Sequence, residues 1–167
     1  MSGPLNLADA DIKGFEALDA GRYDAEIFEM KWDATKGGEN SKMPKGTPLL
    51  KIQFKILNPR IDDQVIEQDR RAFTQYVVPP KGYDSKKAST MNGMIARFFI
   101  ASGDAEEAVR NKSFDPDFED YKGRPVVITL SKEQKYGTNP EDGEWENRVK
   151  AVKAAGSGTG SGSGNLL

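Results

Sequence analysis

The sequence predicts a mainly β fold, with five strands and one main α-helix between the third and fourth strands. Two observations predict the strands: short segments alternate apolar and polar residues with a period of two, and Gly, Pro or Asn residues separate them. A third observation predicts the helix, because apolar residues recur at helical spacing in one segment only. At 167 residues the chain is long enough for one domain with a substantial core.

The first two predicted strands, residues 21–32 and 49–57, show the alternation most clearly. One face of the second strand is apolar and consists of Leu50, Ile52, Phe54 and Ile56. The opposite face carries Lys51, Gln53 and Lys55. This period predicts a strand with one side in the core and a basic, solvated side. The connecting loop, residues 36–46, is rich in Gly and Lys.

The third predicted strand, residues 71–78, ends at two prolines and is followed by a second basic loop, residues 81–87. The main helix is predicted over about 86–102, with Ser85 or Ser89 as its N-cap. Its apolar stripe, which we expect in the core, consists of Met91, Met94, Ile95, Phe98 and Phe99.

Beyond the main helix, residues 104–109 predict a short second helix, and residues 113–122 predict a loop that packs across the barrel or sheet. The fourth strand is predicted at 124–132 and the last at 145–153. Between them, residues 136–143 contain Asn-Pro and Asp-Gly pairs, which are typical of a chain reversal.

Three strands, a helix and two strands is the element order of the OB-fold, a partly open five-stranded Greek-key barrel. We therefore expect a five-stranded OB-fold-like barrel over residues 15–153; a sandwich with one helix has the same element order and stays open. Residues 1–14 predict a flexible N-terminal arm, and the Gly/Ser-rich residues 154–167 predict a flexible tail. The tail is either an inert tail or an engineered scar, or it is a tether that presents its short apolar tip, residues 165–167, to a partner.

The composition excludes several kinds of chemistry. The chain has no Cys and no His, so disulfides, thiolate metal sites, and Ser-His-Asp or Cys-His catalysis cannot be built. We expect a protein that is not an enzyme and that has no metal or cofactor. No apolar run approaches the roughly 20 residues of a membrane helix, and no secretory signal is visible. The sequence therefore predicts a cytoplasmic protein without membrane contact.

Charge is segregated along the chain, although its net value is only −2. Residues 1–30 carry two basic and seven acidic side chains, whereas residues 31–60 carry seven basic and two acidic ones. The basic blocks either pair with the acidic blocks or meet on one face that suits a polyanion.

Single-stranded nucleic acid is bound by a basic groove for phosphates and by aromatic rings on which bases stack. The candidate phosphate contacts are Lys36, Lys42, Lys45, Lys51, Lys55, Lys86 and Lys87. The candidate stacking residues, each beside a Gly-containing loop, are Trp32, Tyr83 and Tyr136. Further basic residues near aromatic ones are Arg71, Lys132 and Arg148. Phe73 is aromatic too, but on this third strand we expect it in the core.

The opening of the domain resembles that of small bacteriophage-encoded single-stranded-DNA-binding proteins. The resemblance is carried by Phe15-x-x-Leu18-x-x-Gly21-x-Tyr23-x-Ala25-x-Ile27, Thr35-Lys36-x-Gly38, Leu50-x-Ile52-x-Phe54-x-Ile56-Leu57 and Gly123-Arg124-Pro125-Val126-Val127-Ile128. It covers roughly residues 15–153. It implies an OB-fold that coats single-stranded DNA during phage DNA replication or recombination in the infected bacterial cell. In bacterial single-strand-binding proteins a Gly-rich tail with an acidic tip binds replication or recombination proteins; here Asn165-Leu166-Leu167 is not acidic.

Three hypotheses follow. The first is a non-catalytic, sequence-tolerant single-stranded-DNA-binding protein. The second is a protein-interaction or assembly module of a phage, which a neutral groove or a large exposed apolar patch would favour. The third is a carboxylate-metal nuclease, which needs Asp and Glu side chains that converge in a cleft. The sequence leaves the oligomeric state open, a homo-oligomer included.

Overall fold

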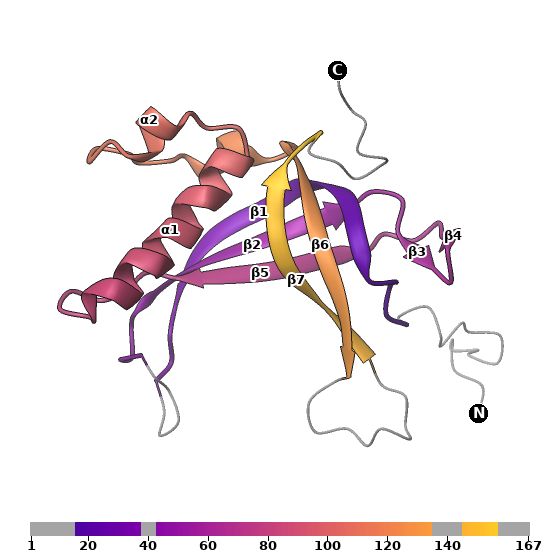
Figure 1. Ribbon diagram of the computed structural model, residues 1–167, viewed down its shortest axis with the longest axis horizontal. Helices are drawn as coiled ribbons and strands as arrows, with labels where there is room; N and C mark the ends of the chain where they lie inside the picture. The colour runs from indigo at the N-terminus through magenta and orange to yellow at the C-terminus, as the bar shows by residue number, and fades with distance from the viewer. Residues whose placement is uncertain (1–15, 38–42, 135–144, 157–167) are drawn as a thin grey trace, which may run out of the picture.

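The computed structural model describes residues 16–37, 43–134 and 145–156. One antiparallel sheet contains β1 (Gly21–Ala34), β2 (Pro48–Ile56), β5 (Arg71–Val77), β6 (Pro125–Gln134) and β7 (Trp145–Ala154). A small separate hairpin is formed by β3 (Arg60–Ile61) and β4 (Gln64–Val65). The helices are α1 (Ser85–Ala101), α2 (Glu106–Val109) and the 3₁₀ helix η2 (Phe118–Tyr121). The predicted mainly β fold, with one main helix between the third and fourth strands of the sheet, is confirmed (Figure 1).

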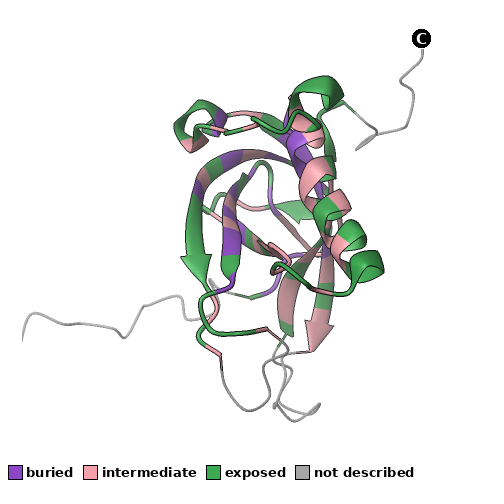
Figure 2. Ribbon diagram, turned by 90° about the vertical axis from the view of Figure 1, so that its left-hand side faces the viewer, coloured by how far each residue is buried: buried purple, intermediate pink, exposed green. Residues whose placement is uncertain are grey.

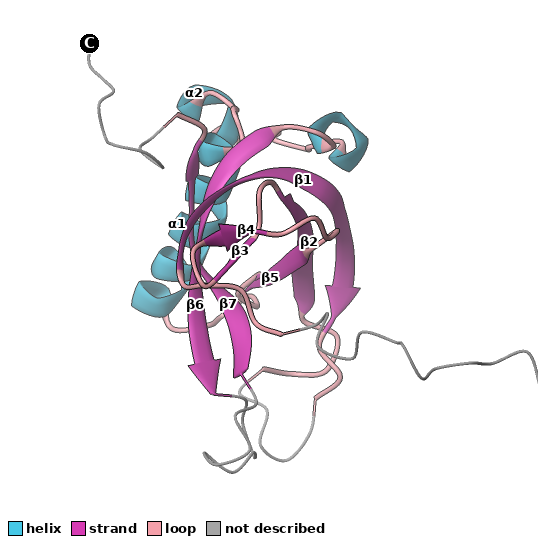
Figure 3. Ribbon diagram, turned by 90° about the vertical axis from the view of Figure 1, so that its right-hand side faces the viewer, coloured by secondary structure: helices cyan, strands magenta, loops and turns pink. Residues whose placement is uncertain are grey.

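The strand order of the sheet is β5-β2-β1-β6-β7, so β1 is central and pairs with both β2 and β6. The sheet is strongly curved (Figure 3), but within the described residues no ladder joins its edge strands, β5 and β7. The predicted OB-fold-like barrel is therefore not supported: the strands form an open sheet. Strands β5 and β7 approach each other, and helix α1 contacts both of them, but among the described residues no backbone ladder joins the two strands.

The apolar alternation of β2 places one row of side chains in the core. Leu50, Ile52, Phe54 and Ile56 are all buried, as predicted. The same concave side receives Tyr23, Ala25 and Ile27 of β1 and Val126, Ile128 and Leu130 of β6. Figure 2 shows buried and exposed positions alternating along the strands. Burial of this row on one side leaves the other side of β2 for polar residues.

A β-bulge interrupts β1 between Ile27 and Glu29. Before the bulge the odd-numbered residues point into the core; after it Met30, an even-numbered residue, is buried. A bulge adds one unpaired residue to a strand and thereby reverses the alternation beyond it. Lys31 consequently pairs with Lys51 on the outer side of the sheet, and Trp32 pairs with the buried Leu50.

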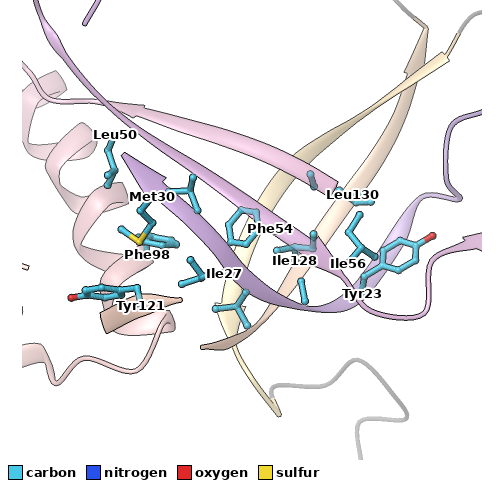
Figure 4. Packing of buried hydrophobic residues seen from close by; sticks show 14 of the residues in the cluster. Tyr23, Ile27, Met30, Leu50, Phe54, Ile56, Phe98, Tyr121, Ile128 and Leu130 are labelled. Atoms are coloured by element: carbon cyan, nitrogen blue, oxygen red, sulfur yellow. The ribbon is translucent and has the colours of Figure 1, made fainter. Parts of the chain in front are cut away.

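Helix α1 covers one end of the core with aromatic side chains. Phe98 is buried, with its ring 6.4 Å from that of Phe54 and 5.9 Å from that of Tyr76. In Figure 4, Phe98 and Tyr121 lie at the α1 end of the core, and Tyr23 lies at the other end. The predicted core stripe is wrong at Met94, which is 46% exposed because it lies on the solvent side of the helix.

The N-cap of α1 also differs from the prediction of Ser85 or Ser89. The side chain of Asp84 accepts a hydrogen bond from the backbone N–H of Lys87 and caps the helix one residue earlier. Among the described residues, no helix is both long and apolar enough to cross a membrane.

Candidate functional site

Three neighbouring strands, β1, β2 and β5, present their solvent-facing side chains together, and we call this surface the outer face. Its register is fixed by the ladders: Lys51 lies opposite Lys31 on one side and Gln75 on the other. The outer face consists of Phe28, Glu29, Lys31, Asp33, Lys51, Gln53, Lys55, Arg71, Phe73 and Gln75. The outward position of Lys51 and Lys55 agrees with the sequence prediction, because their neighbours on β2 are buried.

A groove of about 420 Å³ lies in the outer face. Its lining residues are Glu29, Lys31, Lys51, Ile52, Gln53, Phe73, Thr74 and Gln75. Phe73 is 65% exposed, so its predicted core position is wrong. Ala72 and Tyr76 occupy the inner side of β5 instead, and the pleat turns Phe73 outward between them.

Arg71 is held in place by two neighbours. Its Nε and Nη2 donate hydrogen bonds of 2.7 and 2.9 Å to the two carboxylate oxygens of Asp69. Its Cζ lies 3.6 Å from the centre of the Phe28 ring, a cation–π contact. The hydrogen bonds with Asp69 raise the pKa of Arg71, and they lower the pKa of Asp69 in return.

The lysines of the outer face differ in their partners. Lys51 Nζ lies 2.7 Å from Asp33 Oδ2, and this contact holds the pKa of Asp33 below its ordinary value. Lys31 and Lys55 form no ion pair with any described residue. Exposed ion pairs of the Lys51–Asp33 kind are weak because water screens both charges. Lys51 can therefore exchange its partner for another anion.

Charges of both signs meet on this surface. Its four cations are Lys31, Lys51, Lys55 and Arg71, and its two carboxylates are Glu29 and Asp33. Two more carboxylates adjoin it: Glu26 lies opposite Lys55 in the ladder, and Asp69 binds Arg71. The groove itself is lined by two lysines and one glutamate. The strand surface is thus close to neutral as a whole, and any basic excess has to come from the adjoining loops.

The loop after β1 adds two such lysines. Its base is fastened by Thr35, whose backbone N–H donates to the carbonyl oxygen of Thr47 at 2.9 Å and whose hydroxyl accepts from the backbone N–H of Thr47 at 3.0 Å. Gly37 has φ +71°, and a Cβ built there would lie 3.1 Å from Cβ of Lys45. This close approach brings Lys36 and Lys45 to the same end of the outer face. Lys42, the third predicted contact of this loop, lies outside the described residues.

The predicted contacts Tyr83, Lys86 and Lys87 gather at the start of α1, where they line a shallow hollow with Thr90 and Met91. The chain leaves β5 at Val78, whose backbone N–H donates to the carbonyl oxygen of Pro48, the first residue of β2, at 3.0 Å, and this basic segment follows. The second basic segment therefore follows directly from the edge of the outer face, although none of its residues lines the groove.

Trp32 lies on the opposite side of the sheet from the groove. It pairs with the buried Leu50, and its ring centre is 5.5 Å from that of Phe118. The side chain is still 56% exposed, so the ring is accessible, but at the end of the concave side. The β1 bulge is the cause, because it reverses the alternation before Trp32 is reached.

The remaining predicted residues are not brought to the outer face. Lys132 pairs with Asn147, whose side chain binds the backbone of Leu18, so it lies beside the N-terminal segment. Arg148, on β7, donates to Glu146 at 2.9 Å, and this contact raises its pKa. Tyr136 lies outside the described residues.

The predicted site residues on the outer face are Lys51, Lys55 and Arg71; the prediction did not include the other seven, Phe28, Glu29, Lys31, Asp33, Gln53, Phe73 and Gln75. The alternation of β2 already marks Gln53 as outward. Phe73 and Gln75 are two residues apart on β5 and therefore lie on the same side of the strand, which the sequence indicates once the strand boundaries are known. Phe28 and Lys31 depend on the bulge, for which the sequence carries no clear mark.

No protein-family model matches this sequence, and no curated protein is significantly similar to it. In the part of the chain that the structure describes, no three acidic side chains cluster in a way that could hold a metal ion.

Proposed function

We propose that the protein binds single-stranded DNA without strong sequence preference, through the outer face of β1, β2 and β5. The observation that carries this proposal is the position of Phe73, which stands 65% exposed in a groove between lysine and glutamine side chains. An aromatic ring exposed beside cations is the combination that binds an unpaired base and its phosphate. A buried ring or an uncharged groove would not offer both contacts.

The sheet topology supports the same surface. Counted within the sheet, β2 and β5 are the second and third strands, and the loop of residues 35–47 joins the first and second. In OB-folds the face of strands two and three, with the first connecting loop, binds oligonucleotides. We propose that this chain has an OB-related fold that leaves its sheet open between β5 and β7.

The residue types indicate which side chains bind phosphates and which stack on a base. Lys31 and Lys55 have no ion-pair partner among the described residues and are the first choice for phosphates. Lys36 and Lys45 extend this track along the loop. The stacking of a base on Phe73 tolerates any sequence, because every base has a π-face. The resemblance to phage proteins favours a role in phage DNA replication or recombination, in the cytoplasm of the infected cell.

One observation favours a different function, the docking of a phage protein. The outer face as a whole is close to neutral, and two aromatic side chains, Phe28 and Phe73, are exposed on it. Such a surface also suits a partner protein with mixed charges. The two functions differ in salt dependence, because phosphate binding releases counterions and weakens steeply as salt rises.

Fluorescence anisotropy of labelled oligo-dT, compared with a matched duplex at low and at physiological salt, tests the proposal. We expect salt-sensitive binding that is selective for the single strand. Phe73→Ala should weaken it by about 1–3 kcal/mol, the usual contribution of one stacked base. Val65→Ala is the matched control, because Val65 is 59% exposed on the remote β3–β4 hairpin. No binding at low salt would overturn the proposal and favour the protein-docking function.

A further inference from the structure

Arg71 and Phe28 form a stack between two strands that are not neighbours in the sheet, which an ion pair with Asp69 alone would not require. Arg71 belongs to β5 and Phe28 to β1, and β2 lies between these strands in the sheet. The two side chains therefore meet above β2, on the outer face. A side chain that only balanced the charge of Asp69 would not have to cross a neighbouring strand.

The 3.6 Å between Cζ of Arg71 and the centre of the Phe28 ring means that the guanidinium lies over the face of the ring. An approach in the ring plane would place Cζ inside the van der Waals boundary of the ring edge. Asp69 occupies one in-plane edge of the same guanidinium through two hydrogen bonds. With one face on Phe28 and one edge on Asp69, the side chain keeps 24% of its surface exposed.

Arg71 is also less suited to a phosphate than the neighbouring lysines. One of its two bidentate donor edges, formed by Nε and Nη2, is already bound to a carboxylate, which also neutralises its charge locally. Lys55 lies opposite Arg71 in the ladder and has no ion-pair partner among the described residues. Besides the donors at its Nη1 end, Arg71 still offers a flat, fixed π-surface of positive charge.

We propose that the free face of Arg71 is a second stacking platform for an unpaired nucleobase, held in place by Phe28 beneath it and by Asp69 at its edge. This inference rests on the proposed function, because it names how one part of the same surface binds its ligand. Phe73 lies two residues along the same strand, opposite Gln53 of β2, while Arg71 lies opposite Lys55, so the two platforms are neighbours on the outer face. In duplex DNA both faces of an interior base are already covered by its neighbours, so the platforms select single strands.

The test compares oligo-dT with an abasic oligonucleotide of the same length, which keeps the phosphates and lacks the bases. The measured quantity is the affinity for oligo-dT divided by the affinity for the abasic oligonucleotide. Arg71→Lys keeps the charge but removes the planar surface, and we expect it to lower the ratio about fivefold or more. Phe28→Leu removes the support beneath the guanidinium and should lower the same ratio.

Lys55→Gln is the matched control, because a phosphate contact weakens the binding of both ligands and leaves their ratio unchanged. Asp69→Asn frees the guanidinium and should also lower the ratio, while it strengthens binding of the abasic strand. Unchanged ratios in Arg71→Lys and Asp69→Asn, with wild-type protein binding oligo-dT, would overturn the platform alone. Wild-type protein that binds neither ligand would overturn the proposed function and the platform together.

Discussion

The most direct quantitative prediction concerns the double substitution Lys51→Gln with Lys55→Gln. Both side chains lie on the outer side of β2, while the neighbouring Leu50, Ile52 and Phe54 are buried on the inner side. The substitutions therefore remove two charges without a change in the core. If each lysine neutralises one phosphate, the double variant loses two of the contacts that release counterions.

The magnitude follows from the number of lysines on this path. Three on the strands and two on the loop, Lys31, Lys51, Lys55, Lys36 and Lys45, give a slope of log K against log[salt] of about −3.5, at about 0.7 per phosphate. The double variant should give a slope of about −2.1. Between about 50 and 200 mM salt the wild-type protein should lose about 130-fold in affinity, and the variant about 18-fold.

Anisotropy titrations with oligo-dT at four or more salt concentrations measure both slopes. Further lysines on the path, such as those at the start of α1, would shift both slopes equally and leave their difference at about 1.4. Lys112→Gln with Lys122→Gln removes two exposed charges from the segment between α2 and β6 and should leave the slope unchanged. An unchanged slope in the Lys51 and Lys55 variant would show that phosphates do not follow the outer face.

Asp33→Asn should raise the affinity for oligo-dT, because Lys51 loses its carboxylate partner; a lower affinity in the same titration would contradict this. Phe98→Ala should lower the free energy of unfolding by about 3–5 kcal/mol, since it empties a site among packed rings; urea denaturation measures it, and a loss below about 1 kcal/mol would argue against that packing. Unfolding stability should be flat from about pH 6 to 9. Backbone hydrogen bonds lower the pKa of Asp19, so its contribution to folding stability is complete above about pH 4 and is lost as pH falls further. Burial raises the pKa of Tyr121, so its contribution to folding stability is complete below about pH 10 and is lost as pH rises further. Thermal unfolding from about pH 3 to 11 should show both limbs. Burial also raises the pKa of Tyr23 and Tyr76, so Tyr121→Phe should reduce the alkaline limb without removing it, and should leave the acid limb unchanged.

The element order was predictable because it depends on local pattern. The boundaries of β2, predicted at 49–57, fall at Pro48–Ile56, and those of α1, predicted at 86–102, fall at Ser85–Ala101. Closure of the sheet was not predictable in the same way. It depends on whether the edge strands β5 and β7 form a ladder, and pairing between strands so far apart in sequence leaves no local signature.

The exposure of Phe73 is a second feature that the sequence pattern did not predict. Both faces of β5 carry one aromatic residue, Phe73 on one and Tyr76 on the other. Hydrophobicity alone gives the core to the more apolar ring, yet Tyr76 packs near Phe98 and Phe73 is exposed. The choice is made by Ala72, which is buried on the same side as Tyr76 and leaves room for the aromatic rings of α1. A small residue beside a helix is a tertiary constraint, which the strand pattern does not contain.

The bulge in β1 has the largest consequence for function. Continued strict alternation from Ile27 would place Glu29 and Lys31 in the core, where unpaired charges are strongly unfavourable. The extra residue, Phe28, lets Met30 take the core position and returns Lys31 to the outer side, opposite Lys51. The same insertion leaves the Phe28 ring itself on that surface, under Arg71. One irregular residue therefore protects the core and supplies both a cation and an aromatic ring to the surface on which we propose that DNA binds.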